Sequence, residues 1–124
     1  MLALEPVRGL RVIAASDALD AARWTGPVVV LRIAPDEALA IDAVTVDVDD
    51  ADAIVERETG FVGARLTAAD LQQVIAHMDW PLPSDLGALA QGKIAGVPAK
   101  ILIDERPLLV VQAAHADDLL SRLR

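Results

Sequence analysis

The stretch Phe61-Val-Gly-Ala-Arg-Leu-Thr-Ala-Ala-Asp-Leu-Gln-Gln-Val-Ile-Ala-His-Met78 decides the fold, because a strand pattern in it runs directly into a helix pattern. Thr67 and Asp70 have the spacing of a capping box, in which each side chain accepts a hydrogen bond from the other residue's backbone N–H. Helical spacing then gives one apolar face, formed by Leu71, Val74, Ile75 and Met78. Pro81 ends the helix, since the residue before a proline disfavours helical backbone angles.

Working outward, the remaining elements are mostly short strands separated by turn residues. We expect strands at residues 28–33, 38–41, 44–48, 54–58, 61–66, 92–103 and 108–112. Gly60 predicts either a bend or a hairpin between two of these strands, and a bulge is expected at Gly96 and Pro98 within another. Ser16 is the expected cap of a short helix over residues 17–24, and a final helix is expected from Ala116.

This order of elements predicts an α+β fold. A strand, a helix, two strands and a helix with short links are typical of a ferredoxin-like sandwich, whose helices cover one face of a mainly antiparallel sheet. We expect residues 1–124 to form a single domain, with residues 1–27 as an amino-terminal arm and short helix and residues 28–124 as the core. Within the arm, residues 10–14 form either an edge strand or a packed segment.

The composition predicts one aliphatic core. Apolar residues make up 54% of the 124 positions, whereas aromatic residues make up only 2%. The aromatic residues are Trp24, Phe61 and Trp80. The core must therefore be built from Ala, Val, Leu and Ile, and most of the chain is expected to be ordered.

The net charge of −8 argues against several classes of partner. An acidic chain repels nucleic-acid phosphates and anionic membrane surfaces, so neither is expected as a partner. The absence of cysteine excludes disulfides, thiolate catalysis and cysteine-ligated metals. The start of the chain lacks a signal-peptide pattern and no apolar run reaches the length of a membrane span, so we expect a cytoplasmic protein. The expected partner is another protein or a second copy of the chain.

Two segments resemble ligand-binding motifs without their decisive residues. Residues 87–94 match G-x-x-x-x-G-K, but Ile94 stands where a phosphate loop needs a hydroxyl. Residues 47–58 place carboxylates at calcium-loop positions 1, 3 and 12, but Ala51 and Asp52 replace the ligand and the glycine expected at positions 5 and 6. We interpret the first match as coincidence and the second segment as a solvated acidic loop.

The titratable residues show no catalytic arrangement. His77 lies beside Asp79, and His115 precedes two aspartates, but no serine or threonine stands in a recognisable nucleophile turn. We interpret both histidines as surface or helix-end residues. The paired carboxylates fall at turns and helix starts, where Asp is favoured for structural reasons. The sequence therefore predicts no catalytic residue, no cofactor and no metal.

Trp80 either fills the core or anchors a partner, and the sequence favours the first role in a chain so poor in aromatics. If a partner does bind, the candidate interface residues are Trp80, Leu82, Leu108 and Val110. Two alternatives stay open. One is a small-molecule-binding domain or minor enzyme with a crevice near Trp80. The other is a homodimer of structural role that pairs through a sheet edge, at residues 108–111 or near Leu10.

Several segments, taken in order, carry a family resemblance. Residues 31–41 hold a strand, a Pro-Asp-Glu turn and a second strand, and residues 46–51 form an acidic strand containing valine. Residues 66–75 form the capped helix, and residues 90–101 precede the closing strand and helix at residues 108–120. Together they resemble the γ-subunit family of heterotetrameric sarcosine oxidase and, more distantly, the ferredoxin-like amino-terminal part of folate-dependent aminomethyltransferases.

The resemblance covers about residues 28–124 and implies a function without catalysis. In that family the γ subunit is a structural partner, while the flavin and folate chemistry belongs to larger subunits. No catalytic residue is therefore carried over to this chain. The implied function is that of an accessory or assembly protein that acts through protein–protein contacts.

Overall fold

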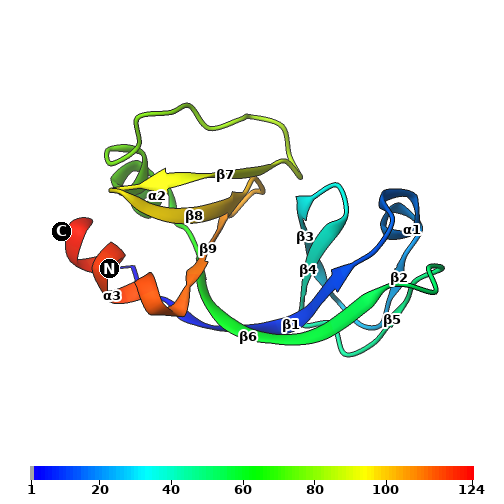
Figure 1. Cartoon of the computed structure of the whole chain (residues 1–124). Coiled ribbons are helices and arrows are strands. Elements are labelled where there is room, and N and C mark those ends of the chain that lie inside the picture. The colour runs from blue at the N-terminus through cyan, green and yellow to red at the C-terminus, as the bar shows by residue number, and fades with distance from the viewer. Residues whose placement is uncertain (1) are drawn as a thin grey trace. The chain divides into compact units, whose positions relative to one another are not determined.

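Two long strands, β1 (Glu5–Ile13) and β6 (Ile54–Arg65), contribute to both of the units into which the chain divides. The computed structural model describes Leu2–Arg124. The amino-terminal unit is Val7–Thr59, and the carboxyl-terminal unit is Gly60–Arg124 together with residues 2–6. Figure 1 shows the elements of each unit along the chain.

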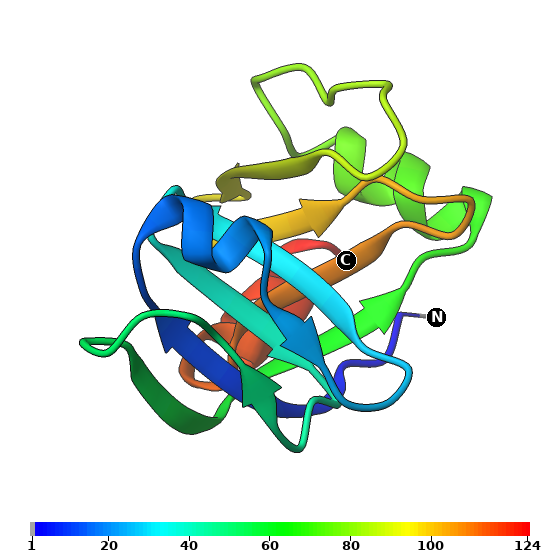
Figure 2. The same ribbon diagram turned by 90° about the vertical axis from the view of Figure 1, so that its right-hand side faces the viewer.

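The amino-terminal unit has a sheet with the hydrogen-bonded order β3-β4-β1-β6. Its further elements are α1 (Ser16–Asp20), β2 (Arg23–Trp24), β3 (Val29–Ala34), β4 (Glu37–Ile41) and β5 (Val46–Asp47). Strands β2 and β5 form a separate antiparallel pair. Helix α1, seen beside the sheet in Figure 2, packs Leu19 into a core with Val12 and Ala40. Alanine is frequent in this core, so helix and sheet can approach closely.

The carboxyl-terminal unit has a sheet with the order β6-β9-β8-β7 and antiparallel pairing throughout. Its further elements are α2 (Ala68–Ile75), β7 (Leu89–Ile94), β8 (Val97–Leu102), β9 (Leu108–Gln112), the 3₁₀ turn η1 (Ala113–His115) and α3 (Ala116–Arg122). Val74 of α2 and Leu119 of α3 are both 0% exposed and share one aliphatic core with Leu109 of β9. The prediction of an α+β chain with a mainly antiparallel sheet and few helices is confirmed.

Helix α2 begins as its sequence predicts. The backbone N–H of Asp70 donates to Thr67 Oγ1 at 3.1 Å, and the N–H of Thr67 donates to Asp70 Oδ2 at 3.1 Å. The capping box is therefore complete, and it satisfies donors that a helix start otherwise leaves without partners. The final helix from Ala116 is confirmed as well.

The expectation of one bulged strand over residues 92–103 is wrong. The segment is a hairpin, with β7 and β8 in register on either side of Ala95 and Gly96. Both turn residues have positive φ, 50° at Ala95 and 81° at Gly96. Two-residue hairpin turns of this kind favour Asn-Gly or Gly-Gly, so an alanine in the first position hides the turn from sequence analysis.

Two further expectations about element boundaries are corrected. Gly60 lies inside one continuous strand, so β6 is not a hairpin. The first helix ends at Asp20, and Ser16 does not cap it with its side chain. Instead, the N–H of Ala15 donates to Asp50 Oδ2 at 2.8 Å, so the acceptor comes from a distant part of the chain. Local sequence patterns cannot reveal such a long-range cap.

The expected arm is part of a sheet. Residues 9–13 of β1 pair with β4, and β1 lies between β4 and β6 instead of at an edge. Leu10 and Val12 share a core with Ala38 and Ala40, so residues 7–27 belong with residues 28–59. Strand β5 is also shorter than expected, at Val46–Asp47. No helix between Leu2 and Arg124 has the length and apolar character needed to cross a membrane.

Candidate functional site

An apolar groove of about 460 Å³ opens on the carboxyl-terminal unit. Helix α2 forms one wall, the segment from Leu82 to Leu86 forms another, and the turn after β8 closes it. The apolar side chains that line this groove are Leu71, Ile75, Leu82, Leu86 and Ile103. We refer to it below as the α2 groove.

The α2 groove holds large apolar side chains that the chain itself leaves in contact with water. Leu86 is 72% exposed and Ile75 is 39% exposed. Leu71 and Leu82 are half-buried because they pack against the core of the unit. Isolated exposed leucines are common in proteins, but several around one groove are typical of a contact surface.

The chain builds the groove by tethering a loop against a helix. The N–H of Gly87 donates to the carbonyl of Ile103 at 2.7 Å, and the N–H of Ile103 donates to the carbonyl of Ala88 at 2.8 Å. These bonds fix the loop that carries Leu86 to the end of β8. On the opposite wall, Val74 is fully buried, which leaves Ile75 at the margin of the apolar helix face.

Carboxylates surround one end of the groove. Asp104 and Glu105 line it, and Asp104 Oδ2 accepts a hydrogen bond from Arg65 Nη1 at 3.1 Å. At the start of α2, the N–H of Thr67 lowers the pKa of Asp70, so this carboxyl stays ionised in mildly acidic solution. The apolar floor therefore meets an acidic rim.

Trp80 fills the place where a crevice was expected. Its indole lies on Gly92 of β7, where an added Cβ would come 2.6 Å from the ring atom Cε2. Trp80 Nε1 donates to the carbonyl of Lys93 at 2.8 Å. The glycine leaves space for the ring and the hydrogen bond fixes it, so Trp80 acts as a structural plug on the sheet.

The four predicted interface residues do not come together. Leu82 lines the α2 groove, whereas Trp80 covers Gly92. Leu108 and Val110 are buried in β9, which is hydrogen-bonded to β6 on one side and to β8 on the other. The edge pairing expected at residues 108–111 is therefore not available, because both sides of that strand are used.

Sequence analysis missed Leu86, the most exposed of the large apolar side chains that line the groove. The available signal was a lone leucine within the polar segment Pro83-Ser-Asp-Leu86, which has no periodicity to explain it. Ile75 was assigned to the apolar face of the helix, but its position at the margin depends on how α2 packs. The groove joins segments far apart in the sequence, so periodicity alone could not reveal it.

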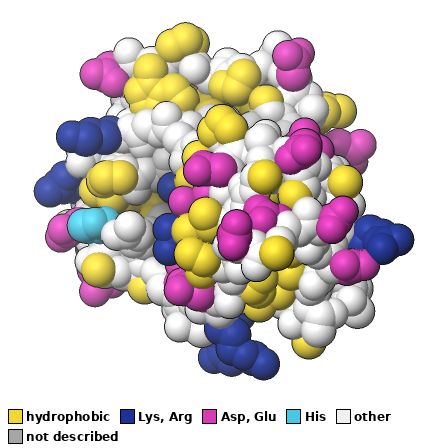
Figure 3. Space-filling view, turned by 45° about the vertical axis from the view of Figure 1, so that its right-hand side comes forward, with side chains coloured by type: hydrophobic (Ala, Val, Ile, Leu, Met, Phe, Trp, Pro, Cys, Tyr) yellow, Lys and Arg dark blue, Asp and Glu magenta, His cyan; other side chains and the backbone are white. Residues whose placement is uncertain are grey.

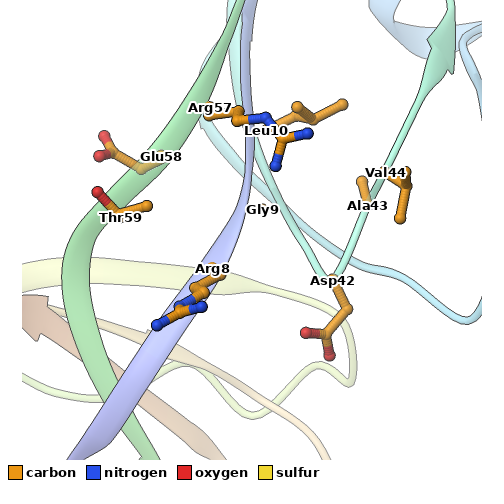
Figure 4. Close-up of a pocket in the computed structure, with 9 residues that line it drawn as sticks. All are labelled: Arg8, Gly9, Leu10, Asp42, Ala43, Val44, Arg57, Glu58 and Thr59. Atoms are coloured by element: carbon orange, nitrogen blue, oxygen red, sulfur yellow. The ribbon is translucent and has the colours of Figure 1, made fainter.

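A second hollow, of about 270 Å³, lies on the amino-terminal unit. It is lined by three short segments, residues 8–10 of β1, 42–44 after β4, and 57–59 of β6. Figure 4 shows Arg57 extending from β6 across β1, with Arg8 on β1 itself and Asp42 at the turn beside that strand. We refer to it below as the arginine hollow.

The residues tested as catalytic or metal-binding candidates have structural surroundings. His77 follows the end of α2, and its Nδ1 lies 2.9 Å from the carbonyl of Gln73 in that helix, while His115 lies in η1. The G-x-x-x-x-G-K segment enters β7 instead of a helix, so it forms no phosphate cradle. Over Leu2–Arg124, no polar or charged residue is buried and no cluster of three His, Cys, Asp or Glu residues could hold a metal.

No family model, no curated protein and no solved structure matches the chain.

Proposed function

We propose that this chain is an accessory or assembly protein that binds a partner protein through the α2 groove. The observation that carries the proposal is the gathering of Leu86 and Ile75, both exposed, with Leu71 and Leu82 around one hollow. Burying large apolar side chains of this kind contributes about 1.5–3 kcal/mol each, so a partner that covers them gains binding energy from a small surface.

The partner is expected to be basic and to present an apolar segment. Asp104 and Glu105 lie at the rim of the groove, and the whole chain carries a net charge of −8. Figure 3 shows one face of the molecule, where acidic side chains lie singly among apolar ones. Charges of this kind steer a basic partner toward the protein, while the apolar floor supplies most of the affinity.

The family resemblance supplies a specific partner for this proposal. Under the resemblance to γ subunits of heterotetrameric sarcosine oxidase, the partner consists of the larger subunits that carry flavin and folate. With a ferredoxin-like sandwich the carboxyl-terminal unit shares only its two helices and its antiparallel sheet. In that unit β7, β8 and β9 form a consecutive meander, which a ferredoxin-like strand order does not contain.

Co-purification with those larger subunits tests the proposal. The wild-type chain is expected to elute with them in a stoichiometric complex on size exclusion. Leu86→Asp places a charge in the groove and is expected to weaken binding at least about tenfold. Because Leu86 is largely exposed in the isolated chain, the substitution should change the free energy of unfolding by only about 0.5 kcal/mol.

Val55→Asp is the matched control, because Val55 is 45% exposed and lies in the other unit. This variant should bind the partner like the wild type. Equal binding by the wild type and Leu86→Asp would contradict a role for the groove. Absence of any complex with the wild type would contradict the proposed partner.

A further inference from the structure

We propose that the arginine hollow binds a compact oxyanion, a carboxylate or a phosphate, that also carries a hydroxyl group. The hollow belongs wholly to the amino-terminal unit, whereas the α2 groove belongs to the carboxyl-terminal unit. The proposal is therefore independent of the protein–protein function above, and either can fail alone.

Two arginines supply the anion-binding groups. Arg11, Arg23, Arg32 and Arg65 each form an ion pair outside the hollow. Arg8 and Arg57 belong to none of these pairs, although carboxylates outnumber Lys and Arg residues by 19 to 11. A guanidinium presents several N–H donors in one plane, which suits the two oxygens of a carboxylate or the oxygens of a phosphate.

The backbone creates the space between these arginines. At Gly9, an added Cβ would lie 2.0 Å from the carbonyl oxygen of Ala40, so close pairing of β1 with β4 requires a glycine. The neighbouring floor is formed by Leu10 and Ala43, which are buried. An apolar floor below guanidinium groups limits water around a bound anion and strengthens its hydrogen bonds.

Asp42 is the residue that favours a ligand with a hydroxyl group. Its φ is 67°, and its N–H donates to the carbonyl of Arg8 at 2.8 Å, so this turn and β1 are held together. A non-glycine residue at positive φ is uncommon and is often found at functional sites. The Asp42 carboxylate repels a bare anion but accepts a hydrogen bond from a hydroxyl, which favours a hydroxy acid or a sugar-phosphate-like molecule.

The remaining charged group of the hollow is Glu58. In Figure 4, Glu58 and Thr59 extend away from Gly9 on the outer side of β6, while Arg57 reaches over β1. The charge of Glu58 also acts on Arg11, whose pKa is raised chiefly by its hydrogen bond to Glu37. Glu58 lines the hollow as well, so the charges around it are those of Arg8, Arg57, Asp42 and Glu58.

The size of the hollow limits the ligand. Its volume of about 270 Å³ lies just below the range of about 300–1,000 Å³ that is typical of ligand sites, so only a small ligand fits. The hollow is open to solvent, so water competes for the arginines and we expect dissociation constants of about 1 mM.

Isothermal titration with four small ligands tests the proposal. Malate and succinate differ by one hydroxyl and form the carboxylate pair, and glycerol 3-phosphate and propyl phosphate, which lacks its hydroxyls, form the phosphate pair. We expect saturable binding of malate or of glycerol 3-phosphate, at least about fivefold tighter than its partner without the extra hydroxyl. The pair that contains the tighter-binding ligand shows whether the bound oxyanion is a carboxylate or a phosphate.

Variants locate the binding. Arg57→Gln and Arg8→Gln should each weaken it about tenfold. Asp42→Asn should remove the preference for malate over succinate. Arg23→Gln is the matched control, since Arg23 lies in the same unit, outside the hollow, in an exposed ion pair with Asp47. Unfolding midpoints confirm that each variant is folded.

Two results would overturn the proposal. One is the absence of saturable binding by all four ligands at concentrations up to about 50 mM, well above the expected dissociation constant. The other is binding that Arg23→Gln weakens as much as Arg57→Gln, which would reveal a general charge effect. If Asp42→Asn left the preference for malate over succinate unchanged, the requirement that the ligand carry a hydroxyl group would be wrong.

Discussion

At the scale of single residues, aspartate carboxylates accept hydrogen bonds from backbone N–H groups at the starts of helices and in turns. Asp50 accepts hydrogen bonds from the N–H of Ala15 at 2.8 Å and from that of Asp52 at 2.9 Å. Asp70 completes the capping box of α2 with Thr67. These two aspartates thus serve helix starts and turns, which is one reason why the sequence contains aspartates without a catalytic pattern.

Asp50 gives the chain a pH-dependent stability. Its pKa is lowered from 3.8, first by the N–H of Ala15 and then by that of Asp52. A carboxyl whose pKa is lower in the folded state than in the unfolded state stabilises the fold at pH values above its unfolded pKa. This stabilisation is lost as the pH falls through the folded pKa. We therefore expect Asp50→Asn to be less stable than the wild type at pH 7, with a difference that shrinks below pH 3.8.

Urea unfolding from pH 7 to about pH 2.5 measures this difference. Asp49→Asn is the control, because Asp49 is exposed and precedes the capping residue. A loss of stability in Asp50→Asn that stays constant with pH would contradict the account.

Trp80 and Gly92 should be energetically coupled. Gly92→Ala is expected to destabilise the fold by about 1–3 kcal/mol, because its Cβ would overlap the indole ring. In a Trp80→Ala background the same change should cost less than about 0.5 kcal/mol, since the ring is absent. Urea unfolding of the four chains gives the coupling energy, and an equal cost in both backgrounds would refute the packing described.

At the scale of elements, the sequence was informative where a pattern is local. The capping box and the apolar face of α2 could be predicted because their residues are neighbours in the chain. Strands β3, β4 and β9 were also predictable from their β-branched and apolar runs. The interior position of β1 was not, because neighbouring strands in a sheet are chosen by contacts between distant segments.

The β7–β8 turn offers a test at this scale. Ala95 adopts a φ of 50°, which is unfavourable for a residue with a Cβ. Ala95→Gly should therefore raise the free energy of unfolding by about 0.5 kcal/mol, the relief of strain minus the greater flexibility of glycine. Ala51→Gly, at a turn residue without positive φ, should lower it. Destabilisation by Ala95→Gly would argue against this turn geometry.

At the scale of the whole molecule, the candidate sites depend on arrangements that no single segment contains. The α2 groove needs a helix, a loop and a strand end, and the arginine hollow needs three separate segments. Sequence analysis found Leu82 but could not place Leu86 opposite Ile75, or Arg57 near Arg8. Composition did predict the aliphatic lining and the carboxylates of the α2 groove.

Charge also acts against self-association along β6. Strand β9 pairs with β6 only from Phe61 onward, so residues 54–59 have β1 alone as a neighbouring strand. Antiparallel pairing of two copies about a two-fold axis would place Arg57 opposite Arg57, or Glu56 opposite Glu56, depending on register. Opposed like charges destabilise a strand pair, so this edge should not form a homodimer.

Sedimentation equilibrium tests that expectation. The wild-type chain should show no dimer through this edge, and replacing Glu56, Arg57 and Glu58 together with threonine should promote association, because the opposed charges are removed. The charge argument would be contradicted if the wild-type chain formed a dimer and the triple variant associated no more strongly.

The central claim, that the α2 groove is the surface that contacts a partner, can be measured with one fluorescent label. The chain has no cysteine, so Leu86→Cys and Val55→Cys each provide a single labelling site for an environment-sensitive dye. On titration with the larger subunits proposed above as the partner, we predict a saturable blue shift at position 86 and no change at position 55. A complex that shifts the label at position 55 and leaves the label at position 86 in water would contradict the account.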